Sequence, residues 1–198
     1  MFLAGKKANE LNHKVLLDPV GVGASSLRTN TALQLINEIH FDVIRGNISE
    51  IKALSGAKAN TKGVDASSLD EVTQANLDDA VAFMKELASK NNCVVAATGK
   101  YDLVADSSTC YVIKNGIAKM EKITGTGCQL SGIITSFISA NPDCVLQATA
   151  AAICLMGLAG EIAFDKNDGN ATYRNKIIDA IYNMSPSDLA KGAKYEIR

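Results

Sequence analysis

Short apolar runs alternate with helical patterns along the first half of the chain, and this alternation constrains the fold more than any other feature. Residues 15–17 and 93–97 are short and continuously apolar, and residues 41–44 are apolar apart from Asp42, which is typical of strands buried on both faces of a parallel sheet. Residues 77–88 between them carry apolar side chains at helical spacing. The pattern predicts an α/β fold, a three-layer α/β/α sandwich with a mostly parallel central sheet.

The sequence changes character after residue 100. Residues 101–106 and 109–114 are extended runs, and Asn115-Gly116 before residues 117–122 is a strong two-residue hairpin signal. We therefore expect an antiparallel hairpin section within the otherwise parallel sheet. No internal repeat or linker is evident, so residues 1–198 are expected to form a single domain.

A long segment between Lys122 and Glu161 has Asp143 as its only charged residue. The apolar run at residues 144–160 spans 17 residues, fewer than the roughly 20 that a bilayer requires. Helices that are apolar on all sides are usually core helices. We predict two buried helices, residues 128–140 and 144–164, and no membrane span.

Composition and charge exclude several classes of function. Lys and Arg number 20 against 21 Asp and Glu, a formal net charge of -1, which argues against a strongly basic nucleic-acid binder. The five cysteines form no C-x-x-C pair, and there are only two histidines, so a zinc or redox cluster is not indicated. Reduced thiols in a cytoplasmic protein are the simplest interpretation.

The segment Thr124-Gly125-Thr126-Gly127-Cys128 stands between an extended run and a long apolar helix. Glycines permit close approach of the backbone to an anion, and a helix N-terminus supplies unpaired N–H groups and positive potential. The segment therefore predicts an anion hole for a phosphate undergoing transfer. An ordinary tight turn is the alternative, because tight turns use the same residues. The segment is not a Walker A loop, because the required lysine is absent.

Cys128 falls in the first turn of that predicted helix, where a thiolate is favoured. The alternative is a small buried residue, the usual fate of a free cysteine. A thiol enzyme with Cys128 as nucleophile is a further hypothesis, although no histidine stands near the glycine segment. His13 and His40 are interpreted as surface residues.

Two other segments follow predicted parallel strands, where α/β proteins bind ligands. Asp18 ends the first apolar run, and Arg45 and Glu50 follow the second. Arg45 can hold a phosphate, and the two carboxylates can face Mg²⁺ directly or through water. Simpler explanations exist: Asp18 is a common turn residue, and Asn47 with Glu50 has the spacing of a capping box.

Together these segments resemble the hydroxyethylthiazole kinase family of the ribokinase-like superfamily. The most specific features are Arg45-Gly46-Asn47-x-x-Glu50 and Cys128, because most ribokinase relatives carry aspartate at the latter position. The resemblance runs along nearly the whole chain through residues 17–24, 44–50, Lys62-Gly63-Val64-Asp65, Ala97-Thr98-Gly99 and 124–128.

The resemblance implies ATP-dependent phosphorylation of the hydroxyl of 4-methyl-5-(2-hydroxyethyl)thiazole in thiamine salvage, with Mg²⁺ as cofactor and a homotrimer as assembly. It also implies a role for each matching residue: Arg45 and Thr98 contact ATP, Gly125 contacts the thiazole alcohol, Gly125, Thr126, Gly127 and Cys128 form the anion hole, Asp18 and Glu50 face the Mg²⁺–phosphate group, and Cys128 takes the general-base position.

The sequence departs from the family at its N-terminus, where family members carry further strands, helices and thiazole-pocket residues. The expected sheet is therefore N-terminally incomplete, with the nucleotide half of the site present. Two alternative functions remain open. One is a catalytically inactive nucleotide-binding fragment, and the other is a hydroxymethylpyrimidine kinase, which Arg45-Gly46-Asn47 and Cys128 disfavour.

Overall fold

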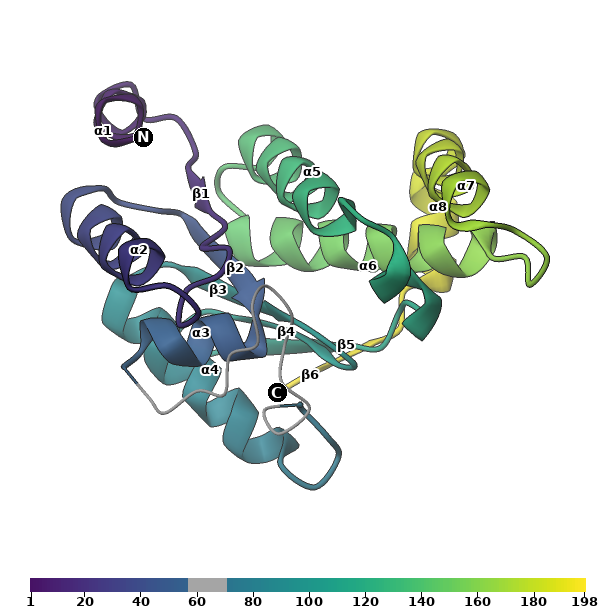
Figure 1. Ribbon diagram of the computed structural model, residues 1–198, viewed down its shortest axis with the longest axis horizontal. Helices are drawn as coiled ribbons and strands as arrows, with labels where there is room; N and C mark the ends of the chain where they lie inside the picture. The colour runs from purple at the N-terminus through teal and green to yellow at the C-terminus, as the bar shows by residue number, and fades with distance from the viewer. Residues whose placement is uncertain (57–70) are drawn as a thin grey trace.

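The computed structural model describes residues 1–56 and 71–198. Within them a mixed sheet lies between two helical layers (Figure 1). Its strands follow the order of the chain from one edge to the other: β1 (Leu16–Leu17), β2 (Val43–Asn47), β3 (Val94–Thr98), β4 (Asp102–Ala105), β5 (Cys110–Ile113) and β6 (Tyr195–Ile197). The first three strands are parallel, and each later strand pairs antiparallel with the one before it.

The helices divide between the two faces of the sheet (Figure 1). One face carries α2 (Ser26–Glu38), α3 (Ile48–Leu54) and α4 (Leu77–Asn91), and the other carries α5 (Thr126–Ala140) and α6 (Val145–Ala163). The remaining helices are peripheral: α1 (Phe2–Glu10) beside α2, and α7 (Asn170–Asn183) and α8 (Pro186–Gly192) against α6.

Alternating side chains of β3 explain why its sequence is continuously apolar. Val95 and Ala97 are buried in the core beneath α2–α4, whereas Val94 and Ala96 are buried in the core beneath α5 and α6. A strand covered on both faces has no solvent-facing position, so both sets of residues are apolar. The predicted α/β sandwich is confirmed, and so are the predicted helices around residues 77–88, 128–140 and 144–164.

The antiparallel section contains the two expected strands β4 and β5, but its third strand is β6 from the end of the chain, and the predicted turn is wrong. Asn115-Gly116 does not form a hairpin, because the side chain of Asn115 accepts from Lys194 N at 2.7 Å and donates to Gly192 O at 3.0 Å. The expected strand at residues 117–122 is instead a 3₁₀ helix, η1 (Ala118–Lys122). The turn between β4 and β5 is closed by Asp106, which accepts from the backbone N–H of Thr109 at 2.7 Å.

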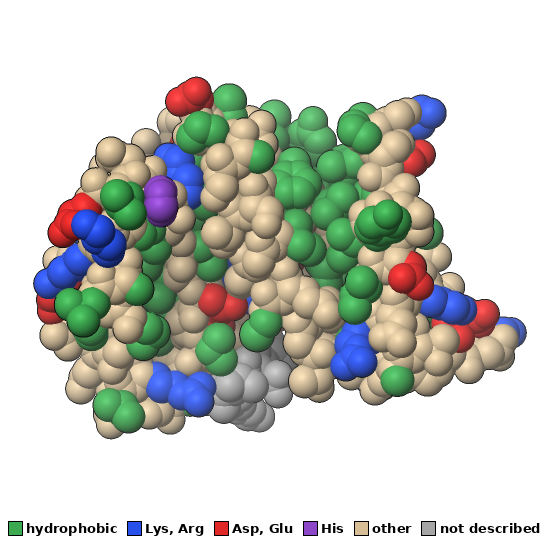
Figure 2. All heavy atoms as spheres, turned by 90° about the horizontal axis from the view of Figure 1, so that it is seen from above, with side chains coloured by type: hydrophobic (Ala, Val, Ile, Leu, Met, Phe, Trp, Pro, Cys, Tyr) green, Lys and Arg blue, Asp and Glu red, His purple; other side chains and the backbone are tan. Residues whose placement is uncertain are grey.

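Helix α6 is long and apolar enough to cross a membrane by composition alone, and 72% of its apolar window is buried inside the fold. It contacts α5, α7, α8 and three strands, so its apolar character is that of a core helix. Figure 2 shows hydrophobic side chains gathered on the side of the molecule that carries α5 and α7. Exposed large hydrophobic residues at the end of α6 and in α7 are Ile162, Phe164, Ile178 and Tyr182.

Candidate active site

The carboxyl ends of the three parallel strands lie at one edge of the sheet. Asp18 follows β1, Arg45 lies within β2, and Thr98 ends β3. The register pairs Asn47 with Thr98. Arg45 was expected in a loop after its strand. It belongs to β2 itself, because β2 extends to Asn47.

Arg45 connects three separate elements through its guanidinium group. Its Nη1 lies 3.2 Å from Asp18 Oδ2 and 3.4 Å from the backbone carbonyl of Gly127, and its Nη2 donates to Thr98 Oγ1 at 3.1 Å. Its Nε is buried and has no hydrogen-bond acceptor among residues 1–56 and 71–198. The site therefore brings together a cation, a carboxylate and a hydroxyl at the start of α5.

The glycine segment forms the N-terminus of α5, as predicted. Gly125 is the N-cap residue, and its φ of 93° is a left-handed conformation that favours glycine. The N–H groups in the first turn of a helix have no intrahelical acceptor and can bind an anion. A Cβ at Gly127 would lie 3.2 Å from Arg45 Nη1, so glycine at this position lets the guanidinium approach the helix.

Cys128 lies in the first turn of α5 and is exposed, so the alternative of a small buried residue is wrong. Cys144 was expected in a buried helix, but it is also exposed, because it precedes the first turn of α6 as the N-cap residue. Burial raises the pKa of Cys93 to about 12 and those of Cys110 and Cys154 to about 11. Cys128 and Cys144 are therefore the two thiols that solvent reaches most freely.

Glu50 joins the loop after β1 to the β2–α3 connection. Its carboxylate accepts from Gly21 N at 2.7 Å and from Asn47 N at 2.9 Å, while Asn47 Oδ1 accepts from Glu50 N at 2.9 Å. The capping box proposed from the spacing is thus present. Burial raises the pKa of Glu50, and its bonds from Gly21 and Asn47 oppose that rise. The segment Lys62–Asp65 lies outside the described residues.

Comparison with known proteins now decides the family. The family model described as Hydroxyethylthiazole kinase family matches residues 1–187. The chain belongs to the hydroxyethylthiazole kinase family. It is 51% identical to hydroxyethylthiazole kinase of Clostridium acetobutylicum over 199 aligned positions, which cover 99% of this chain and 73% of that protein. It is 47% identical to the hydroxyethylthiazole kinase of Clostridium tetani, over 98% of this chain and 70% of that protein.

Solved structures agree with this hydroxyethylthiazole kinase assignment. The hydroxyethylthiazole kinase of Pyrococcus horikoshii superposes with a TM-score of 0.84 at 28% identity, covering 100% of this chain and 70% of that one. A pyridoxal kinase from Staphylococcus aureus shares the fold, with a TM-score of 0.60 at 18% identity over 100% of this chain and 69% of its own.

Two polar residues near the predicted site residues were not indicated by the sequence. Ser131, one helical turn after Gly127, donates to Asp18 Oδ2 at 2.7 Å. Asp102 accepts from Gly99 N at 2.9 Å and closes the turn after β3. Burial raises the pKa of Asp102 to about 7, and the Gly99 N–H and the positive charge of Arg45 oppose that rise. The sequence signals that could have pointed to them are their positions: Ser131 is four residues after Gly127, and Asp102 is four residues after Thr98.

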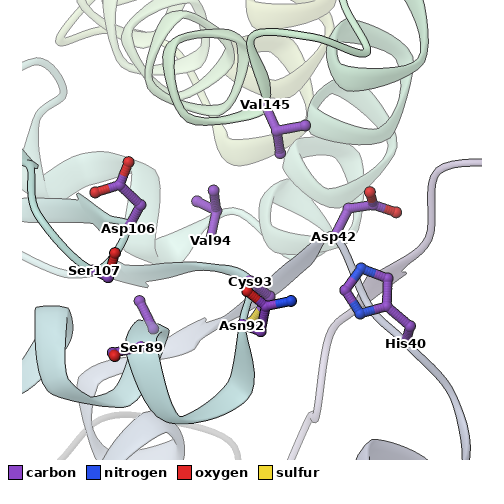
Figure 3. Close-up of a pocket in the computed structure, with 10 residues that line it drawn as sticks. His40, Asp42, Ser89, Asn92, Cys93, Val94, Asp106, Ser107 and Val145 are labelled. Atoms are coloured by element: carbon purple, nitrogen blue, oxygen red, sulfur yellow. The ribbon is translucent and has the colours of Figure 1, made fainter.

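A cavity of about 320 Å³ lies at the opposite edge of the sheet (Figure 3). Its lining includes residues that precede β2 and β3 or follow β4, among them His40, Asp42, Cys93 and Asp106, together with residues of α4 and Val145 at the start of α6. None of the predicted site residues lines it. His13 and His40 are exposed, as predicted. Within the described ranges, no group of three or more His, Cys, Asp or Glu side chains is placed to hold a metal by itself.

Proposed function

We propose that this chain transfers a phosphoryl group from ATP to the hydroxyl of 4-methyl-5-(2-hydroxyethyl)thiazole, a step of thiamine salvage. The observation that carries the proposal is the position of Arg45, whose guanidinium contacts Asp18, Thr98 and the Gly127 carbonyl within 3.4 Å. Phosphoryl transfer requires mainly alignment of the reactants and stabilisation of charge. An arginine at a helix N-terminus supplies both.

In this proposal Arg45 and Thr98 bind ATP, with the phosphates against the first turn of α5. The N–H groups of Gly125, Thr126, Gly127 and Cys128 form the anion hole, because this end of the helix carries positive potential. The Nε of Arg45, which has no acceptor in the described part of the chain, leaves the guanidinium with donor capacity for a phosphate oxygen.

Mg²⁺ fits the oxygen donors of this edge. In proteins it is commonly bound through one or two carboxylates, substrate phosphates and water. Asp18 and Glu50 are the carboxylates that would hold it. Both Glu50 oxygens already accept backbone N–H groups, which favours contact with the metal through water. Bound Mg²⁺ would neutralise charge on the transferring phosphate.

The acceptor alcohol is proposed to bind beside Gly125, with Cys128 as general base. Gly125 is exposed and a Cβ there would meet nothing within 4 Å, so space for a small molecule exists next to it. A weak base suffices for this reaction, because in a loose transition state the hydroxyl proton leaves late. The thiol of Cys128 is exposed on the same turn.

A coupled ADP-release assay tests the function. With ATP, Mg²⁺ and the thiazole alcohol, the chain should release ADP faster than without an acceptor. A parallel reaction contains hydroxymethylpyrimidine in place of the thiazole alcohol. Faster release with the pyrimidine would favour the related vitamin kinase. Nucleotide binding without turnover on either alcohol would indicate an inactive nucleotide-binding fragment.

A cytoplasmic homotrimer is the assembly that we propose for this kinase. Its support is the resemblance to the family and the exposed large apolar side chains Ile162, Phe164, Ile178 and Tyr182, because exposed apolar surface often marks an interaction site. Sedimentation should show a trimer at micromolar concentrations. Only monomer at high concentration would contradict the assembly.

A further inference from the structure

Ser131 makes a contact that links α5 to the end of β1. Its hydroxyl lies 2.7 Å from Asp18 Oδ2 and 3.2 Å from the backbone carbonyl of Gly127. A serine hydroxyl carries one proton and donates to one acceptor at a time. The carboxylate is the nearer acceptor, and bonds to charged acceptors are the stronger ones. Ser131 therefore donates its proton to Asp18, across 113 residues of sequence.

The contacts of Asp18 are unevenly divided between its two oxygens. Oδ2 receives Ser131 Oγ at 2.7 Å and Arg45 Nη1 at 3.2 Å. Across residues 1–56 and 71–198 no side-chain or backbone donor reaches Oδ1. Two donors on one oxygen fix the rotation of the carboxylate and leave the other oxygen free to bind a ligand.

We propose that Ser131 is a positioning residue of the phosphoryl-transfer site. Its hydroxyl holds Asp18 so that one carboxylate oxygen faces the Mg²⁺–phosphate group while Arg45 remains shared with Thr98 and Gly127. This inference rests on the proposed function. It adds a role for α5 beyond the anion hole, because the same helix supplies the donor that orients the carboxylate.

Other hydroxyl groups of α5 show what an ordinary helical serine does. Ser136 Oγ donates to Gly132 O at 3.0 Å, and Thr135 Oγ1 donates to Ser131 O at 2.8 Å. Both are bonds to a carbonyl four residues earlier, a common pattern in helices. Ser131 differs because its nearer acceptor lies on another element. Ser136 is exposed on the same helix and provides a matched control.

The test compares Ser131→Ala, Ser131→Thr and Ser136→Ala by thermal unfolding with ATP at increasing Mg²⁺ concentration. Loss of an outer partner of a metal-binding group typically weakens metal affinity about 10- to 100-fold. We expect Ser131→Ala to need at least about 10-fold more Mg²⁺ for half of the full shift in melting temperature. The shift with ATP and EDTA should not change. Ser131→Thr retains the hydroxyl and should restore the wild-type response, and Ser136→Ala should match wild type.

Ser131→Cys covers the case in which the alanine variant does not fold, since a thiol has nearly the same size and is a weak donor. A wild-type Mg²⁺ response in Ser131→Ala or Ser131→Cys would overturn the inference. So would equal losses in Ser131→Ala and Ser136→Ala.

Failure of the proposed function is distinguishable from failure of this inference. A wild-type chain that gains no stability from MgATP and releases no ADP would contradict the proposed function alone. Denaturant unfolding of Ser131→Ala, Asp18→Asn and the double variant then tests the link without ligand. Additive effects would overturn the link between Ser131 and Asp18, and non-additive effects would support it.

Discussion

Arg45 Nη1, in β2, lies 3.2 Å from Oδ2 of Asp18, which directly follows the neighbouring parallel strand β1, and the two side chains of this ion pair are only 11% and 17% exposed. The pair is long for a charge-assisted bond, because the same Nη1 also reaches the Gly127 carbonyl at 3.4 Å. Arg45 is thus shared among acceptors from three elements, and an anionic ligand can compete for it.

Replacing Arg45 should weaken nucleotide binding more than folding. Arg45→Ala removes the cation and the contact with Thr98, so we expect it to lose most of the melting-temperature rise that MgATP produces. Arg45→Lys retains the charge but not the planar fork, and should lose an intermediate part. The measurement is thermal unfolding with and without MgATP. Equal stabilisation of wild type and both variants would refute the ligand role.

Gly127→Ala should disturb Arg45 without removing it. The new Cβ would lie 3.2 Å from Nη1, so the guanidinium must move, and a several-fold higher MgATP concentration should be needed for half-maximal stabilisation. Gly132→Ala on the same helix is the control, because a Cβ there meets nothing within 4 Å. It should raise the free energy of unfolding by roughly 0.5–1 kcal/mol. An unchanged nucleotide response in Gly127→Ala would contradict the prediction.

Glu50 and Asp188 occupy equivalent positions in two capping boxes. Glu50→Ala leaves the N–H groups of Gly21 and Asn47 without their acceptor, which should cost about 1–3 kcal/mol of unfolding free energy for each buried group. It should also reduce stabilisation by MgATP. Asp188→Ala, at the exposed box of α8, should lower stability without affecting nucleotide. If both variants kept the full MgATP effect, Glu50 would serve the helix cap alone.

Asp102 should make stability depend on pH. Its pKa is raised from 3.8 to about 7 in the folded chain, so the folded state binds its proton more tightly than the unfolded state does. The stabilising contribution is complete below about pH 4 and is lost as the pH rises through about 7. Denaturant unfolding between pH 4 and 8 measures this, and Asp102→Asn should flatten the profile. A profile that Asp102→Asn leaves unchanged would show that another group titrates.

The parallel half of the fold was predictable because the burial of each strand is visible in the sequence of that strand alone. β3 is covered on both faces, which leaves a continuous apolar run in the sequence, and β2 begins with the buried pair Val43 and Ile44. β6 was missed because its three residues, Tyr195–Ile197, lie partly exposed at the sheet edge and carry no such run. The turn signal at Asn115-Gly116 failed because contacts with Gly192 and Lys194 overrode the local preference.

The candidate site also divides into residues that the local sequence predicts and residues that depend on contacts between distant segments. Asp18 and Arg45 lie at or near the carboxyl ends of predicted parallel strands, so a shared edge could be expected from the sequence, whereas Thr98 was expected only from the family resemblance. Ser131 could not be found this way, since its bond to Asp18 depends on how α5 lies relative to the residue that follows β1. Asp102 depends on the closed turn after β3, where Gly99 donates to its carboxylate.

The most direct test of the account is the rate of thiazole phosphate formation by wild type, Cys128→Ala and Cys144→Ala, followed by mass spectrometry. Both cysteines are exposed at helix N-termini, but only Cys128 follows the glycine segment. Wild type and Cys144→Ala should form the product at the same rate. Cys128→Ala should be slower by roughly 10²-fold or more, as expected for loss of a general base, with ATP affinity retained. Equal rates in wild type and Cys128→Ala, or no product from wild type, would contradict a kinase centre at the start of α5.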